Sequence, residues 1–238
     1  MFRLFNGNID LAAYLIQLLV LFGSLCVHEF SHAWTAYRLG DSTAAQMGRL
    51  TLNPLAHMDP LGSLMIIMGA PIGWARPVPV NPSRFKAGCS LRRGMALTSV
   101  AGPASNLVLA FIGYFCHSLL RVLLLLSHAV PGAFGLALLR YTSLFFILLF
   151  QLNIFLAVFN LLPLPPLDGS KIWSIFLPDR QYYQLMRYER QIGLALLLVV
   201  FFLPQVLRRV LDVVAWPFIQ LISVPLDWLV SLLTGGLV

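Results

Sequence analysis

Charged side chains are scarce in this sequence. Asp, Glu, Lys and Arg make up only 11% of the 238 residues, whereas hydrophobic residues make up 59% and the mean hydropathy is +0.83. Soluble domains carry about 25% charged residues, so this composition excludes an ordinary soluble domain. It indicates a protein that crosses a lipid bilayer several times.

Cysteine is scarce as well. Cys26, Cys89 and Cys116 lie far apart and form no CxxC pair. This spacing excludes a disulfide framework and a thiolate zinc site. The formal net charge is +7, but the basic residues follow the loops and form no patch interleaved with aromatic residues. We therefore expect no nucleic-acid partner.

Long apolar runs predict the membrane helices. Three runs cover about residues 11–39, 95–126 and 137–162, and each exceeds the roughly 20 helical residues that cross a bilayer. Two further apolar stretches, about 191–207 and 213–233, either both cross or leave one lying flat. We expect an all-α polytopic membrane protein with about four to six membrane helices. The first run is too long for the apolar core of a signal peptide, so we expect the mature protein to retain it.

The segment between the first and second runs is rich in glycine and proline. Its apolar stretch, residues 61–70, is too short to cross a bilayer and predicts a re-entrant or surface element. In residues 74–80 the pattern alternates and includes prolines, which favours a short β-hairpin or an exposed edge strand over a helix.

The basic residues predict the orientation. Residues 38–93 hold seven Lys and Arg and residues 171–190 hold four, so eleven of the sixteen fall on one side, which the positive-inside rule makes cytoplasmic. The cell membrane is the expected location, with the active site near its cytoplasmic face. Arg208 and Arg209 conflict with this topology if the fourth apolar stretch crosses.

The pentapeptide His28-Glu29-Phe30-Ser31-His32 lies inside the first apolar run. On a helix the two imidazoles project from one face with Glu29 beside them, which is the arrangement that binds zinc and activates water. Chance alone would produce this motif on the order of once in a thousand such chains. The alternative, a pair of core histidines, is disfavoured because ionisable residues within a membrane span usually mark a function.

Catalytic zinc takes three protein ligands, and Asp168 is the expected third. It follows the third run and the prolines that end it, on the side where the first run also ends. Two carboxylates, Asp168 and Glu29, would balance the charge of the ion, which lowers the cost of burial. Two alternatives remain: Asp168 caps the next helix, or His57 and Asp59 provide ligands instead.

At this point the chain resembles the site-2 protease family of intramembrane zinc metalloproteases. The resemblance combines the pentapeptide with residues 160–169 (NLLPLPPLDG), and it extends to residues 48–54, 57–62 and 102–106. It covers about residues 8–178 and is closest to compact prokaryotic members. It implies one catalytic zinc on His28, His32 and Asp168, with Glu29 as general base and acid. It also places Asn160 near the scissile carbonyl, although helix packing explains Asn160 equally well.

The expected substrate is a transmembrane segment of another protein. Its peptide bonds are protected by helical hydrogen bonds, so the protease must hold the unwound segment extended. The stretch around residues 74–80 is the candidate for adding the substrate as a further strand, although an ordinary surface loop is the alternative. The expected substrate-binding residues are Trp74, Ala75, Arg76, Val78 and, after a packing role, Asn106.

We therefore expect residues 1–238 to form one membrane-embedded metalloprotease domain. Its catalytic core covers about residues 8–178, and apolar helices cover about residues 185–235. The alternative is a membrane zinc-binding protein or transporter without hydrolytic activity. A non-catalytic relative would need a broken motif, and the motif is intact. The sequence does not indicate the oligomeric state.

Overall fold

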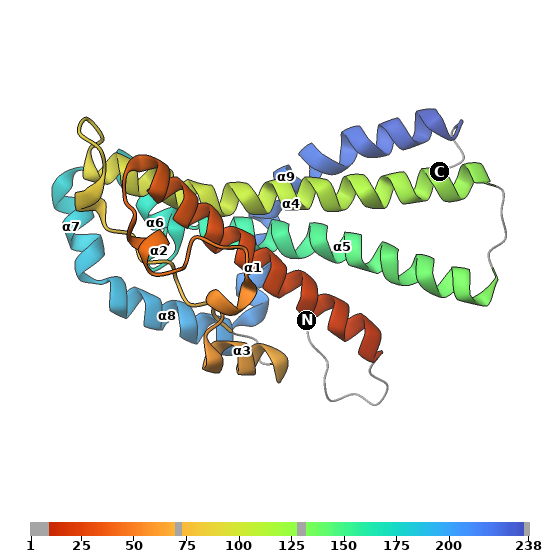
Figure 1. The fold of residues 1–238 in the computed structure, drawn as a ribbon, viewed down its shortest axis with the longest axis horizontal. Helices are drawn as coiled ribbons and strands as arrows, with labels where there is room; N and C mark the ends of the chain where they lie inside the picture. Colours follow the sequence, from red (N-terminus) through yellow and green to blue (C-terminus); the bar gives the residue numbers. More distant parts are fainter. Residues whose placement is uncertain (1–9, 70–72, 128–131, 236–238) are drawn as a thin grey trace.

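The computed structural model describes residues 10–69, 73–127 and 132–235. Residue 70, the last of the short apolar stretch expected at residues 61–70, lies outside them. Four long helices dominate the described chain: α1 (Leu11–Leu39), α4 (Leu91–Ser127), α5 (Ala133–Leu161) and α9 (Pro204–Leu233). Helices α4 and α5 run along the longest axis of the molecule, and α1 crosses obliquely to them (Figure 1).

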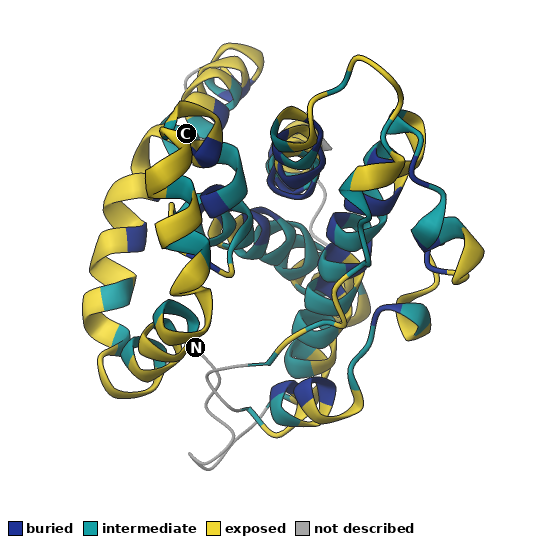
Figure 2. Ribbon diagram, turned by 90° about the vertical axis from the view of Figure 1, so that its left-hand side faces the viewer, coloured by how far each residue is buried: buried dark blue, intermediate teal, exposed yellow. Residues whose placement is uncertain are grey.

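All four helices are long and apolar enough to cross a membrane. The shortest have 29 residues, which corresponds to about 44 Å of helix against a hydrocarbon core of about 30 Å. The expected multi-pass helical architecture is therefore confirmed, with four candidate spans in the described chain. Figure 2 shows exposed residues on the outward faces of these helices and buried residues on the faces turned inward.

Both ends of helix α1 are capped by neighbouring residues. The Asp10 carboxylate accepts a hydrogen bond from the Ala13 amide and caps the first turn. At the other end Gly40 adopts φ +112°, the left-handed conformation that favours glycine, and its amide bonds the last carbonyls. The histidine motif lies within the last four turns, because His28 is eleven residues before the final residue Leu39.

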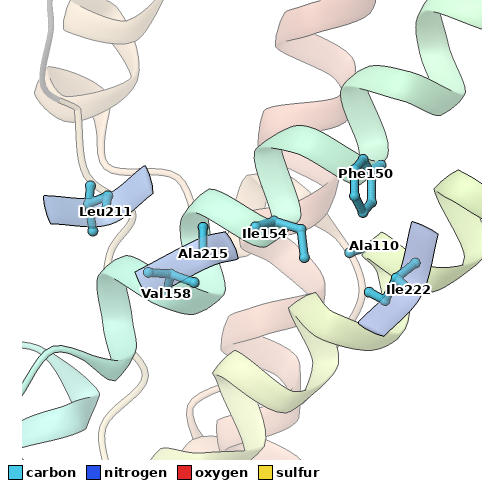
Figure 3. Close-up of a cluster of buried hydrophobic side chains, with 7 residues drawn as sticks. All are labelled: Ala110, Phe150, Ile154, Val158, Leu211, Ala215 and Ile222. Carbon is cyan, nitrogen blue, oxygen red and sulfur yellow. The ribbon is translucent and has the colours of Figure 1, made fainter. Parts of the chain in front are cut away.

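The core between α4, α5 and α9 consists of small and branched aliphatic side chains and one aromatic ring (Figure 3). Its buried members are Ala110, Phe150, Ile154, Val158, Leu211, Ala215 and Ile222. Leu211 and Ala215 lie toward Val158, whereas Ile222 lies beside Phe150 (Figure 3). Helix α9 therefore starts at the end of α5 that leads into residue 168 and runs back along it.

Between α1 and α4 the chain forms only short elements: α2 (Thr43–Gln46), η1 (Pro54–Ala56), α3 (Pro60–Ile67) and η2 (Pro82–Arg84). Helix α3 has eight residues and is too short to span a bilayer. The expected β-hairpin or edge strand is not confirmed, because the described residues contain no strand and only an isolated antiparallel bridge between Met58 and Ala75. The ladder does not continue past this bridge, because the next amide on that side, the amide of Val78, bonds the Glu29 side chain instead of another strand.

After α5 the chain forms α6 (Asp168–Trp173), η3 (Ser174–Phe176), α7 (Asp179–Arg187) and α8 (Glu189–Phe202). Helix α8 has 14 residues, or about 21 Å, so it cannot cross a bilayer on its own. The apolar stretch expected at residues 191–207 is therefore divided between two helices. Pro204 explains the division, because it lacks an N–H group and starts α9 instead of continuing α8.

Candidate metal centre

Three ligand atoms from α1 and α6 converge in the interior. His28 Nε2 and His32 Nε2 lie 3.0 Å apart, and Asp168 Oδ2 lies 3.3 Å from the first and 3.1 Å from the second. Both histidines are buried, with 5% and 8% of their surfaces exposed. Together with Asp168 they form the one group of three or more potential metal ligands found in the described part of the chain. Donor atoms around a tetrahedral zinc lie about 3.3 Å apart, so these three fit the ion.

The other nitrogen of each imidazole already has a partner. His28 Nδ1 lies 2.5 Å from Asn106 Oδ1, and His32 Nδ1 lies 2.7 Å from the Thr98 carbonyl oxygen. Because a carbonyl oxygen can only accept, each Nδ1 carries a proton, and in the neutral imidazole each Nε2 then presents its lone pair. Two lone pairs and a carboxylate then face one another, an arrangement that a cation stabilises. This chemistry is the second reason why the residues fit zinc.

The turn after α5 brings Asp168 to the histidines. Helix α5 ends at Leu161, and α6, which begins at Asp168, packs against α4. Gly169 permits the close approach, because a Cβ there would overlap the carbonyl groups of Leu161 and Leu162. Asp168 Oδ2 therefore reaches both imidazoles and can serve as the third ligand.

One stripe of α4 supports both imidazoles. Thr98, Gly102 and Asn106 follow one another at intervals of four residues and share a helix face. Gly102 lies against the rings: a Cβ there would be 2.5 Å from His28 Cε1 and 2.6 Å from His32 Cε1. Only glycine leaves room at this position for both rings in their present places.

Glu29 lies one residue from His28 and contacts the segment that follows the Met58–Ala75 bridge. The Val78 amide donates a hydrogen bond of 2.9 Å to Glu29 Oε2. The same segment is held by two other contacts: the Arg76 amide donates to the His57 carbonyl at 2.8 Å, and buried Arg49 donates to the Arg76 carbonyl at 2.5 Å. The extended segment is therefore fixed next to the glutamate of the motif.

The remaining substrate candidates have different environments. Trp74 is 40% exposed and its ring packs over Gly62, whereas Ala75 forms the isolated bridge. Asn106 is fully buried behind His28, so it does not lie on a surface that a peptide can reach. Asn160 donates to the Leu156 carbonyl of its own helix at 3.0 Å and has no hydrogen bond to the three converging residues.

The alternative ligands His57 and Asp59 do not join the three. His57 Nε2 bonds the Thr51 carbonyl oxygen at 2.8 Å, and Asp59 caps α3 by accepting from the Gly62 amide at 2.8 Å. These are the roles that His and Asp commonly take in loops rich in turn residues.

Several residues at the centre were not expected from the sequence. Asn153 bonds Asn106, and Ser24 bonds Asn153 in turn. The sequence could have indicated Asn153, since an amide within an apolar run usually has an interhelical partner. It could not have indicated the Thr98 contact, because any residue has a backbone carbonyl.

Comparison with known proteins identifies the family of this chain. The model of peptidase family M50 matches residues 16–203. A Bacillus subtilis protein named "Putative zinc metalloprotease YwhC" is 43% identical over 196 residues, which cover 82% of this chain and 83% of that protein. Two proteins named "Putative zinc metalloprotease Rip2" match over 82% of this chain and 70% of their own length: one from Mycolicibacterium smegmatis at 34% identity, one from Mycobacterium tuberculosis at 36%. No solved structure matches the chain.

The matched region includes the histidine motif on α1, all of α4 and α5, and Asp168 at the start of α6. The resemblance inferred from the two short motifs is confirmed over most of the chain. This chain belongs to peptidase family M50.

Proposed function

We propose that this member of peptidase family M50 cleaves a peptide bond within or next to a membrane-spanning segment of another protein. In this proposal one zinc ion is held by His28, His32 and Asp168. The observation that carries it is the convergence of two imidazole lone pairs and a carboxylate within 3.3 Å, inside a bundle of candidate membrane helices.

Glu29 is proposed to move the proton. A zinc ion held at this centre supplies a Lewis acid that polarises the scissile carbonyl and makes a water molecule nucleophilic. Glu29 Oε2 is held by the Val78 amide, which leaves Oε1 to accept the proton of the attacking water. The same carboxyl group then delivers this proton to the amine of the leaving segment.

The segment around residues 74–80 is proposed to hold the substrate in an extended form. The amides of Arg76 and Val78 already bond the protein itself, and alternate residues of an extended chain face opposite sides. The other side therefore presents Ala75, whose backbone has no hydrogen bond within the described chain, and the carbonyl of Pro79. The Pro77 carbonyl also faces this side and has a long contact of 3.5 Å with Arg49. A substrate that pairs there would mainly donate its own amides, which an unwound helix has available.

The proposed location is the cell membrane, with the centre near the cytoplasmic face. Helix α8 is too short to span, so Arg208 and Arg209, at the start of α9, fall on the same side as residues 171–190. This removes the conflict found in the sequence, and thirteen of the sixteen Lys and Arg residues then lie on one side.

The experiment that tests this function is co-expression of the chain with a panel of single-span membrane proteins, followed by mass spectrometry of their fragments. Glu29→Gln is the matched variant, because it keeps the shape and hydrogen bonding of the side chain and removes its basicity. We expect new fragments with the wild type, none with Glu29→Gln, and equal zinc content in both. Equal fragment patterns in both would contradict the protease assignment and favour a zinc-binding protein or transporter.

A further inference from the structure

A chain of buried polar side chains leads away from His28 through three helices. Asn106 of α4 lies 2.5 Å from His28, Asn153 of α5 lies 2.7 Å from Asn106, and Ser24 of α1 lies 2.8 Å from Asn153. Each of the two asparagines and the serine is at most 1% exposed. Such groups have a large cost of burial unless every member finds a partner, so their arrangement is specific.

The direction of the hydrogen bonds is fixed at the far end. Asn153 Nδ2 lies 2.8 Å from the Leu149 carbonyl oxygen, one turn earlier on the same helix. A carbonyl oxygen accepts and never donates, so the nitrogen of the Asn153 amide must point toward it. The Asn153 Oδ1 atom therefore points toward α4 as an acceptor.

This orientation passes to Asn106 and then to the histidine. Asn106 must present Nδ2 to Asn153 Oδ1, so its own Oδ1 must face His28. Because Asn106 Oδ1 accepts, His28 Nδ1 must donate, which leaves the Nε2 lone pair facing Asp168 and His32. The tautomer of the imidazole is thus determined by a backbone carbonyl that lies three hydrogen bonds away.

We propose that Asn106 and Asn153 are positioning residues that hold His28 in the Nδ1-protonated tautomer and so raise the zinc affinity of the centre. This inference rests on the proposed function, in which His28 is a zinc ligand. His32 achieves the same end in one step, since the Thr98 carbonyl accepts directly from its Nδ1. Hydrogen bonds to the outer nitrogen of a histidine ligand typically change metal affinity by about 10- to 100-fold.

Zinc affinity, measured by competition with a chromophoric chelator on the purified full chain in detergent, tests the proposal. Asn106→Leu removes the acceptor, and we expect about 10- to 100-fold weaker binding. Asn106→Asp keeps an acceptor for His28 but has no N–H to donate to Asn153 Oδ1, so we expect it to bind zinc more tightly than Asn106→Leu. Asn153→Leu does not touch His28, yet it frees the Asn106 amide to reverse and should cause a smaller loss.

Two further variants make the result unambiguous. Ser118→Ala is the matched control, because it also changes a buried polar side chain of α4, one without a hydrogen-bond partner in the described chain. It should bind zinc like the wild type. Asp168→Ala should abolish binding if the proposed centre is right. The thermal unfolding midpoint of each metal-free variant shows whether it has kept its fold.

The outcomes separate the two proposals. If Asp168→Ala loses zinc while Asn106→Leu keeps wild-type affinity, the positioning role is overturned and the zinc centre stands. Equal losses in Asn106→Leu and Asn106→Asp would also overturn it, because a purely structural role for the amide predicts them. If Asp168→Ala keeps zinc, the proposed centre itself is wrong. An unchanged affinity in Asn153→Leu would overturn the part of the proposal that extends beyond Asn106.

Discussion

Replacing Gly102 with alanine adds one methyl group between the two imidazoles and α4. The new Cβ would lie 2.5 Å from His28 Cε1 and 2.6 Å from His32 Cε1, well inside van der Waals contact. One or both rings must then move. Overpacking of this kind typically costs about 1–3 kcal/mol. If zinc binding requires both rings to return to their present places, this cost weakens the zinc affinity. The affinity then falls by about 5- to 150-fold, at 1.4 kcal/mol for each tenfold change.

The helix itself cannot account for such a loss. Alanine is the better helix former by about 0.5–1 kcal/mol, so Gly102→Ala should favour α4 as a helix. Gly23→Ala is the matched control, since a Cβ at Gly23 of α1 would meet no atom within 4 Å. We expect Gly23→Ala to keep its zinc affinity and proteolysis, and Gly102→Ala to show the weaker affinity given above and slower proteolysis. Chelator competition and a cleavage assay measure them. Wild-type zinc binding and cleavage by Gly102→Ala would refute the placement of the rings against α4.

Three other substitutions probe the surroundings of the centre. Val78→Pro removes the amide N–H that donates to Glu29. We expect unchanged zinc content and a cleavage rate that is lower by about 10- to 150-fold. This range corresponds to the loss of a hydrogen bond to a charged group, which contributes about 1.5–3 kcal/mol. Asp59→Ala removes the N-terminal cap of α3 and should lower the free energy of unfolding by about 1 kcal/mol, while zinc stays bound. Loss of zinc in this variant would indicate instead that Asp59 is a metal ligand. Burial raises the pKa of Asp41, but hydrogen bonds from neighbours including the Asn81 amide lower it by more. Asp41 thus has a net pKa below the ordinary value. Its stabilisation is therefore present above the unfolded pKa of about 3.9 and is lost as the pH falls through the lower folded value. The difference in melting temperature between wild type and Asp41→Asn should shrink accordingly on acidification, and a constant difference would contradict this cause.

The helical architecture could be predicted because its signals are local. Apolar runs predicted α1, α4 and α5 within a few residues, since membrane spans require long segments without charge. The break between the last two helices was expected at residues 208–212 and lies at Leu203 instead, although Pro204 was visible in the sequence. Pro217 and Pro225 lie inside α9 without ending it, so proline alone does not identify which position interrupts a helix.

The extended segment around residues 74–80 could not be predicted as accurately. Alternation favoured a strand, but a strand needs a partner from elsewhere in the chain. Here the Val78 amide bonds the Glu29 side chain instead of a neighbouring strand. The segment is held instead by contacts with Glu29, Arg49 and His57. None of these contacts follows from a local pattern, because each joins residues at least 19 positions apart.

The candidate ligands could be predicted from the sequence, but the groups that hydrogen-bond to them could not. His28 and His32 are one helical turn apart, so secondary structure alone aligns them, and Asp168 was placed by the order of the spans. The Asn106–Asn153 pair depends on how α4 crosses α5, and the Thr98 carbonyl belongs to the backbone. Identifying such partners requires the packing of the helices and not only their sequences.

X-ray absorption at the zinc edge of the purified Glu29→Gln protein, which we expect not to cleave itself or its substrate, tests the central claim most directly. We expect two imidazole nitrogens and at least one oxygen at about 2.0–2.2 Å and no sulfur. Asp168→Ala should bind little zinc or give a spectrum without the carboxylate contribution. A sulfur ligand, or a spectrum and zinc content unchanged by Asp168→Ala, would contradict a centre made of His28, His32 and Asp168.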